Sequence, residues 1–415
     1  MPDLSFYIIW SAYFVSLYFV IFWILVLLEK GYKDSVLKPL KSFPKVSVII
    51  PAYNEGEKVA GTIESALRLN YPKEKLEIIA VNHGSSDNTL EVMNRYREGV
   101  KVVTYGRKGQ ERKGGAVNFG LKIATGEFVA CLDADSSIEP DALHKMLPYF
   151  EDKELGAVLP KIIPSEPKNF IQKIQYCEYV VVFFFKKMMG AVDCLYTAPG
   201  PFSLYRRSVI EKVGGFDAEN LTEDMELAVR LQKNHYKIIQ TTDVEANTIT
   251  PHTFKDYFNQ RNRWYKGALF NIFKHRDLIL NRKYGDFGML QMPFIPGAAI
   301  LSVLVFTIIT INKLLVPAFK KLQAYYYGGI NFGLFFEWLR NFSILDLNFD
   351  MLFWFWLLIV IQLVLIVWAH KVTKKKLFKE RKSSPIAFLF IYSITIFIVW
   401  WYVIFDLLKM KTQRW

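Results

Sequence analysis

The sequence predicts an α/β domain with a mostly parallel, Rossmann-like sheet, inserted between transmembrane α-helices. Two observations indicate this fold: long apolar blocks lie towards both ends of the 415-residue chain, and short β-branched runs alternate with helix-like stretches in its middle. The length leaves room for one α/β domain of about 250 residues beside several membrane helices. We therefore divide the chain into an N-terminal transmembrane helix (residues 1–29), a cytosolic α/β domain with amphipathic interface helices (residues 30–285) and a membrane domain with about three helices (residues 286–415).

Four apolar runs have the length that a membrane span requires. The first, residues 7–28, lacks the basic flank and small-residue cleavage site of a secretory signal, and its roughly 20 residues match about 30 Å of hydrocarbon. We expect an uncleaved anchor. The other three runs are residues 289–311, 351–369 and 386–408. Residues 312–350 are less uniformly apolar, and both an external loop and a re-entrant segment fit them.

Basic residues flank these runs unevenly, and this asymmetry predicts the orientation of the chain. No Lys or Arg precedes the first span, whereas five lysines follow it between residues 30 and 45, which places the N-terminus outside and the middle domain in the cytosol. The basic linker at residues 370–382 then also falls inside. We interpret the net charge of +13 as topology rather than as nucleic-acid binding, and we expect a multi-pass protein of the plasma membrane. Three widely spaced cysteines form neither a disulfide nor a zinc pattern, in keeping with a reduced, cytosolic setting.

The middle domain alternates predicted strands and helices. The first strand, residues 46–50, is a β-branched run ended by Pro51, and apolar residues at helical spacing follow it. The later strands are expected at residues 76–81, 100–104 and 128–132, and the helices at residues 55–69, 85–96 and 116–124. This order is typical of a parallel sheet covered by helices, in which ligands bind at the carboxyl ends of the strands.

Two further segments are expected to form helices with apolar faces. Residues 180–185 are intensely apolar but far shorter than a membrane span, so a buried or interfacial helix is favoured over a segment that re-enters the bilayer. Residues 254–287 mix aromatic and basic side chains just before the second span, a pattern that suits an amphipathic collar on the inner membrane surface.

Asp133-Ala134-Asp135 follows directly on the predicted strand at residues 128–132. Two carboxylates at the exit of a strand are placed to hold a hard cation such as Mg²⁺ or Mn²⁺, which prefers oxygen ligands and often bridges to phosphate oxygens. Alone, the pattern also fits a turn or a helix cap. The other motifs of the chain favour the metal interpretation.

Six motifs follow one another along the middle of the chain. They are Pro51-Ala52-Tyr53-Asn54-Glu55, Asn82-His83-Gly84-Ser85-Ser86-Asp87, Lys113-Gly114-Gly115-Ala116-Val117-Asn118, Asp133-Ala134-Asp135, Thr222-Glu223-Asp224 and Gln260-Arg261-Asn262-Arg263-Trp264. Their order resembles glycosyltransferase family 2 of the GT-A fold, in particular the processive membrane synthases related to the cellulose, chitin, hyaluronan and poly-N-acetylglucosamine synthases. The resemblance runs from about residue 46 to residue 267.

The resemblance implies how the donor, a nucleotide-sugar and most simply a UDP-sugar, would be held. Asp135 would bind the metal, and Asp133 the metal or the ribose. Arg263 would pair with diphosphate oxygens. The remaining donor-binding residues would be Ala52, Tyr53, Glu55, His83, Lys113 and Ala134. Where family members usually have Asp-Gly-Ser, this chain has His83-Gly84-Ser85, which leaves open the nucleotide preference and the strength of donor binding.

The resemblance also assigns the chemistry. Asp224 would be the general base that removes a proton from the acceptor hydroxyl, so that attack opposite the diphosphate inverts the anomeric centre. Thr222 is also expected to cap a helix beginning at Glu223. Acceptor-binding residues would be Glu223, Gln260 and Trp264, whose indole suits the face of a sugar ring. Upstream, residues 199–202 and the pair Arg206-Arg207 are expected to shape the acceptor side.

Three functions therefore remain for the chain. The first is extension of a β-linked polysaccharide at the inner membrane face, which the Gln-x-x-Arg-Trp pattern of residues 260–264 favours. The second is a single transfer to a lipid carrier such as a polyprenyl phosphate or a glycolipid. The third is a non-catalytic membrane scaffold, suggested by His83. Because four spans are few for a conduit, a second copy of the chain or an export partner is expected to complete one.

Overall fold

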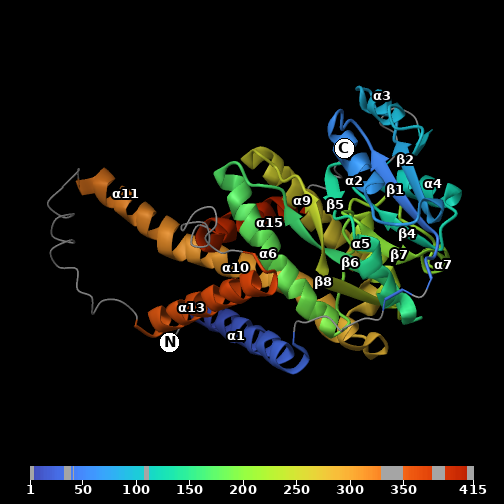
Figure 1. Ribbon diagram of the computed structural model, residues 1–415. Helices are drawn as coiled ribbons and strands as arrows, with labels where there is room; N and C mark the ends of the chain where they lie inside the picture. The colour runs from blue at the N-terminus through green and yellow to red at the C-terminus, as the bar shows by residue number, and fades with distance from the viewer. Residues whose placement is uncertain are drawn as a thin grey trace. The chain divides into compact units, whose positions relative to one another are not determined.

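The computed structural model of the chain describes residues 4–31, 39–40, 42–106, 112–328, 349–375 and 388–408 (Figure 1). The chain divides into two compact units. One consists of Met1–Leu25 and Gly297–Val367, and the other of Val26–Pro296 and Trp368–Trp415. The second unit contains the α/β domain and the last apolar helix, so this helix belongs to the same compact unit as the sheet.

Four parallel strands form the first half of the sheet. They are β1 (Val46–Ala52), β2 (Leu76–Asn82), β3 (Lys101–Thr104) and β4 (Phe128–Cys131), in the order β3-β2-β1-β4. Every residue of β1 is buried, because helices cover both faces of the sheet. Val48 and Ile50 pack in the core on the side of α2 (Lys58–Leu67), and Ile49 packs on the side of α4 (Lys113–Ile123). The predicted order of strands and helices is confirmed here, with α3 (Thr89–Asn94) shorter than expected.

The second half of the sheet introduces antiparallel strands. β7 (Ser203–Arg206) runs antiparallel to β4, and β6 (Leu155–Pro164) runs antiparallel to β7. β8 (Lys237–Thr248) is parallel to β6, and the short β5 (Ser136–Ile138) closes the edge antiparallel to β8. The sheet has eight strands in the order β3-β2-β1-β4-β7-β6-β8-β5. It is mixed but mostly parallel, which confirms the predicted fold class.

Helix α6 (Phe170–Ala191) contains the apolar run at residues 180–185. It begins with a capping box, in which Asn169 Oδ1 accepts a hydrogen bond from the backbone N–H of Gln172 at 2.9 Å. Val180 and Phe184 are fully buried, and the helix packs on β6 and β8. The apolar run therefore lies inside a longer helix with one buried face, in agreement with the prediction of a buried helix.

The predicted amphipathic stretch at residues 254–287 is mainly the helix α9 (Phe254–Lys274), followed by short 3₁₀ turns. Helix α9 packs against α8 (Glu223–Lys233). It also packs against the last apolar helix, α15 (Ser393–Leu408), which lies beside it in Figure 1. Lys266 and Asp406 form a buried ion pair between α9 and α15. The rings of Tyr265 and Trp400 stack beside it with centroids 4.6 Å apart.

The remaining helices of the sheet domain are α5 (Ala142–Met146) and α7 (Arg207–Lys212). Outside it, the apolar helices are α1 (Leu4–Lys30), α10 (Met292–Ile309), α11 (Val316–Gly328) and α13 (Phe349–Val372). Among the described residues, three segments are long and apolar enough to cross a membrane, namely Phe6–Lys30, Phe287–Lys320 and Phe388–Leu407, and Trp356–Val372 is a shorter apolar helix. Most of the segment whose loop or re-entrant character was left open, residues 329–348, lies outside the described residues, as do residues 376–382 of the basic linker.

Candidate active site

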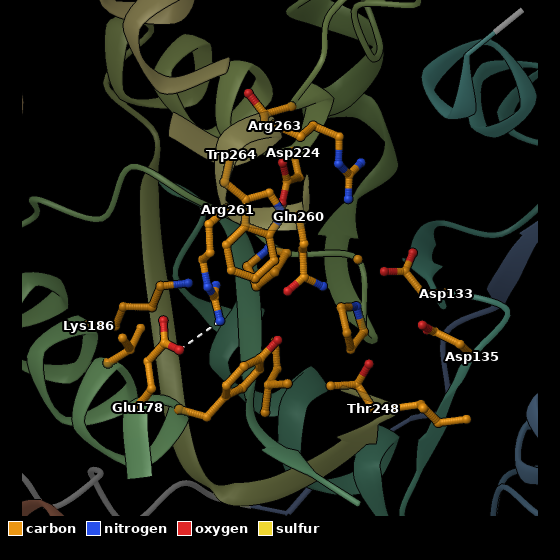
Figure 2. Close-up of a pocket in the computed structure, with 18 of the residues that line it drawn as sticks. Asp133, Asp135, Glu178, Lys186, Asp224, Thr248, Gln260, Arg261, Arg263 and Trp264 are labelled. Carbon is orange, nitrogen blue, oxygen red and sulfur yellow. Dashed lines mark hydrogen bonds and ion pairs between the residues drawn. The ribbon is translucent and has the colours of Figure 1, made fainter. Parts of the chain in front are cut away.

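A cleft of about 240 Å³ opens where the carboxyl end of β4 meets the start of α8, the helix α6 and the helix α9 (Figure 2). Residues that lie far apart in the sequence line it together. The predicted site residues in the lining are Lys113, Asp133, Asp135, Glu223, Asp224, Gln260, Arg263 and Trp264. The sequence motifs that follow β4, open α8 and lie on α9 thus share one cavity.

Asp133 and Asp135 lie on one side of this cleft, just beyond the end of β4 (Figure 2). The backbone turns sharply here, because the N–H of Ser136 donates to the carbonyl of Asp133 at 3.0 Å. Burial raises the pKa of Asp135, and the charge of Asp133 raises it further. A divalent cation would relieve this repulsion, and the oxygen donors fit Mg²⁺ or Mn²⁺. Because no cluster of three or more metal-ligating side chains occurs among the described residues, such an ion would need further ligands from phosphate or water.

Lys113 at the start of α4 connects the two acidic parts of the cleft. Its Nζ lies 2.5 Å from Asp133 Oδ1 and 3.3 Å from Glu223 Oε1. Burial alone would lower the pKa of Lys113, but the two carboxylates outweigh it and raise the pKa. Gly200 lies against Asp133, where a Cβ atom would collide with the carboxylate. The Asp133 side chain is therefore held between the Lys113 ammonium group and the backbone of Gly200.

Asp224 lies in the first turn of α8, with its side chain in the cleft (Figure 2). Its Oδ1 accepts a hydrogen bond from the backbone N–H of Met225 at 2.8 Å. Burial raises the pKa of Asp224 to about 6, with help from Glu223, while Lys113 and Lys186 act in the opposite direction. A carboxylate with this pKa is a competent proton acceptor near neutral pH.

The start of α8 is held by α9 rather than by the predicted cap. Thr222 precedes the helix, but its side chain makes no capping hydrogen bond, so that expectation was wrong. Instead, Thr222 Oγ1 accepts a hydrogen bond from Asn271 Nδ2 of α9 at 3.0 Å, and the backbone N–H of Thr222 donates to Asn220 Oδ1 at 3.0 Å. A Cβ atom at Gly267 would lie 2.9 Å from the Cβ of Thr222. The absence of a side chain at Gly267 lets α9 approach the segment that carries Asp224.

The α9 motif presents Gln260, Arg263 and Trp264 to the cleft, and it also presents Arg261. Arg261 is only 2% exposed, and its Nη2 donates to Glu178 Oε2 on α6 at 2.7 Å. Burial alone would lower the pKa of Arg261, but the charge of Glu178 outweighs this effect and raises it. The pKa of Glu178 is raised by its own burial. This ion pair forms part of the cleft wall opposite Asp133 and Asp135 (Figure 2).

The remaining predicted donor residues lie outside this lining: Ala52, Tyr53, Glu55 and His83 near the ends of β1 and β2, and Ala134 just beyond β4. The backbone N–H of His83 donates to the carbonyl of Ala52 at 2.8 Å, and the Tyr53 and His83 rings meet edge to face at 5.7 Å. Burial raises the pKa of Glu55, and the charge of Asp135 adds to this effect. Ala134 is buried in the core, so its contact with a donor stays a prediction.

Several residues of the cleft were missed at the level of sequence. Tyr179, Val182, Phe183 and Lys186 of α6 line it together with Glu178 (Figure 2). The first four recur at positions i, i+3, i+4 and i+7, the spacing of one helix face. This periodicity was visible in the sequence. In the sequence, however, it indicates only an apolar helix face and does not distinguish a buried face from a cavity wall.

The pair Arg206-Arg207 does not lie in the cleft lining, contrary to expectation. Arg206 pairs with Phe128, the first residue of β4, at the sheet edge opposite the aspartates. Its guanidinium lies over the Phe128 and Phe150 rings, 5.4 and 5.5 Å from their centroids. β7 therefore reaches the cleft only through the loop before it, where Pro199, Gly200 and Pro201 line the cavity as predicted. Phe202 was expected beside them, but it is buried in the core of the domain.

Comparison with known sequences identifies the family of the first part of this domain. Residues 47–214 match the family described as Glycosyl transferase family 2. The chain is 30% identical over 268 residues to the poly-beta-1,6-N-acetyl-D-glucosamine synthase of Staphylococcus epidermidis, covering 63% of this chain and 65% of the relative. It is 32% identical over 243 residues to the probable glycosyltransferase YdaM of Bacillus subtilis, covering 57% of this chain and 58% of the relative. The matches thus span less than two thirds of either relative's length.

A solved structure supports the fold. The mannosyltransferase PcManGT from Pyrobaculum calidifontis, determined with GDP-Man and Mn²⁺, superposes with a TM-score of 0.56 at 20% identity. The superposition covers 77% of this chain and 91% of that one. At this identity the likeness concerns the fold alone. Residues 47–214 therefore match glycosyltransferase family 2, and the chain has the GT-A fold that the order of its motifs indicated.

Proposed function

We propose that the chain is an inverting, metal-dependent glycosyltransferase that moves a sugar from a nucleotide-diphosphate donor onto a growing β-linked polysaccharide at the inner face of the membrane. One observation carries this proposal: Asp133 and Asp135, which lie in the segment that matches family 2, line a single cleft with the carboxylate of Asp224 and the indole of Trp264.

Asp224 is the proposed base. It takes the proton of the acceptor hydroxyl while that oxygen attacks the anomeric carbon from the face opposite the diphosphate, which inverts the configuration. The sugar ring that carries this hydroxyl packs on the indole of Trp264, and Glu223 and Gln260 bind it from the sides. Arg263 pairs with diphosphate oxygens. Because burial raises the pKa of Asp224 to about 6, the group is ionised at pH 7 but retains basicity.

Asp133 and Asp135 would hold Mg²⁺ or Mn²⁺, which offsets the negative charge on the departing nucleoside diphosphate. Lys113, within ion-pair distance of Asp133, is placed to contact the diphosphate when Asp133 turns to the metal. Ala52, Tyr53 and His83, near the ends of β1 and β2, are the proposed contacts of the nucleotide base, and Glu55 lies next to them. UDP-N-acetylglucosamine is the first donor to test, since relatives are named poly-beta-1,6-N-acetyl-D-glucosamine synthases.

The proposed topology places the N-terminus outside the cell and the catalytic domain in the cytosol. It rests on the distribution of basic residues and on the three candidate spans. All three cysteines of the chain are buried, so a cysteine introduced at the exposed Glu219 would be the main reactive thiol. A membrane-impermeant maleimide should label Glu219→Cys only after the membrane of intact cells is opened. Labelling of intact cells would contradict the orientation.

The decisive experiment combines the purified full-length chain, Mn²⁺ or Mg²⁺ and a panel of nucleotide-sugars, with nucleoside diphosphate release and product mass as readouts. A ladder of saccharides is expected. A single lipid-linked sugar would instead support transfer to a lipid carrier, an alternative in keeping with the apolar side chains Val182, Phe183 and Ile249 in the cleft wall. Absence of release with every donor would support the non-catalytic scaffold.

A further inference from the structure

We propose that Arg261 and Glu178 form a buried clamp that fixes the indole of Trp264 in its acceptor-binding orientation and ties this orientation to the docking of the last apolar helix, α15. The inference rests on the proposed function for the identity of the ligand on the indole. It adds two positioning residues on α6 and α9 and a third, Tyr392, on the segment that leads into α15.

The first step is the ion pair itself. Arg261 is 2% exposed and Glu178 is 4% exposed, and their atoms Nη2 and Oε2 lie 2.7 Å apart in the cleft wall (Figure 2). A buried ion pair is a poor source of stability, because the cost of removing two charges from water offsets most of their attraction. Its geometry is well defined, however, since neither charge can leave its partner without remaining buried and unpaired. Such a pair suits the task of fixing a position.

The second step is the contact of this pair with the indole. The Arg261 guanidinium carbon lies 4.1 Å from the centroid of the Trp264 ring and 4.9 Å from that of Tyr257. The three residues recur at i, i+4 and i+7 along α9, so they lie on one face of the helix. A planar cation close to a ring restricts how the ring can turn. The indole that lines the cleft is therefore held from behind by a side chain that is itself fixed by Glu178.

The third step is the connection to the last apolar helix. The hydroxyl of Tyr392, in the π-helical turn Phe388–Tyr392 that leads into α15, donates to Glu178 Oε1 at 3.2 Å. Farther along α15, Asp406 pairs with Lys266 of α9, and Trp400 stacks on Tyr265. Residues 388–408 thus contact Glu178 on α6 and also the helix α9, which carries Arg261 and Trp264. Displacement of this segment would release Glu178 from one of its two hydrogen-bond donors.

Substitution of Arg261 by Lys tests the clamp most cleanly. Lysine keeps the positive charge that Glu178 needs, but it lacks the planar group that lies against the indole. We expect the KM for the acceptor to rise about tenfold, the size of a desolvated cation–aromatic contact, while the donor KM and acceptor-independent donor hydrolysis stay unchanged. The assay uses the full-length chain, UDP-N-acetylglucosamine and a β-1,6-linked N-acetylglucosamine tetrasaccharide as the acceptor probe.

A second variant replaces no charged residue. Tyr392→Phe removes one hydroxyl from the turn before α15 and leaves Arg261 and Glu178 in place. We expect a smaller rise in the acceptor KM, in the same direction and again without a change in the donor KM. Because this substitution is mild, it remains informative if Arg261→Lys fails to fold.

The matched control is Arg206→Lys. Arg206 also lies over aromatic rings, those of Phe128 and Phe150, but at the sheet edge away from the cleft. Its replacement should leave the acceptor KM at the wild-type value. Melting temperatures of all variants report on folding separately.

The outcomes separate the inference from the proposed function. If the wild-type chain transfers sugar and both Arg261→Lys and Tyr392→Phe keep the wild-type acceptor KM, the clamp is refuted and the function stands. Equal losses in donor and acceptor KM would also refute it, since they would indicate general damage to the fold. A wild-type chain that releases no nucleoside diphosphate would overturn the proposed function and the inference together.

Discussion

Replacement of Asp224 by Asn should greatly slow transfer and at the same time stabilise the fold at neutral pH. Burial, with help from Glu223, raises the pKa of Asp224 from 3.8 to about 6. At about 1.4 kcal/mol per pKa unit, ionisation of this carboxyl at pH 7 costs the folded state about 3 kcal/mol. Asn carries no charge and removes this cost. The gain has about 3 kcal/mol as its upper bound, because Lys113 and Lys186 lose an opposite charge.

The sign of the effect with pH follows from linkage. A carboxyl group whose pKa is higher in the folded than in the unfolded chain loses its contribution to stability as the pH rises from the lower to the higher value. For Asp224 this window runs from 3.8 to about 6. The melting temperatures of Asp224→Asn and wild type should therefore coincide near the lower limit, diverge through the window in favour of the variant, and differ by a constant amount above it.

The assay measures nucleoside diphosphate release and thermal melting on the same purified full-length chain. General-base catalysis contributes about 10²- to 10⁴-fold, so the rate should fall by that factor while donor binding is retained. The control is Glu219→Gln, an exposed carboxylate on the loop before α8, which should change neither property. Full activity of Asp224→Asn would refute its role as base. A lower melting temperature than wild type at pH 7 would refute the cost assigned to its burial.

Three further substitutions test neighbouring parts of the cleft. Asp135→Asn should lower the rate by about a hundredfold or more, since a bound metal contributes several kcal/mol, and calorimetry should show weaker Mn²⁺ binding; unchanged binding would exclude Asp135 as a ligand. Lys186→Met removes a charge that lowers the pKa of Asp224, so the acid limb of the pH profile of kcat/KM should move to higher pH. An acid limb that does not move would contradict the electrostatic contact. Gly267→Ala should destabilise the fold by about 1–3 kcal/mol and slow transfer, because its Cβ would collide with Thr222. The control is Gly61→Ala, where nothing lies within 4 Å of the added atom and no loss of stability is expected.

The sequence was sufficient for the parallel half of the sheet and for the residues at its strand ends. β1 and β2 are mostly apolar because both faces of the sheet are covered, and Asp133 and Asp135 follow the carboxyl end of β4. Such local patterns are legible without knowledge of the tertiary structure. The antiparallel insertion of β7 between β4 and β6 was not predicted, since its four residues carry no signal of their partner.

The errors at the site have a common cause in long-range contacts. Thr222 has the local sequence of a helix cap, yet its hydroxyl oxygen accepts a hydrogen bond from Asn271 of α9 instead. The apolar residues of α6 predict a buried helix face, because apolar periodicity does not distinguish a core from the wall of a cleft. Glu178 and Arg261 become recognisable as a pair only when α6 and α9 lie side by side.

A structure of the full-length Asp224→Asn chain with Mn²⁺, a nucleotide-sugar and a saccharide acceptor would test the central claim most directly, which is that donor, metal and acceptor meet in the cleft between β4, α6, α8 and α9. We predict that Mn²⁺ is bound by Asp135 and that the terminal acceptor ring packs on Trp264. The acceptor hydroxyl should lie between residue 224 and the anomeric carbon. A metal bound away from Asp133 and Asp135, or an acceptor bound outside this cleft, would contradict the account.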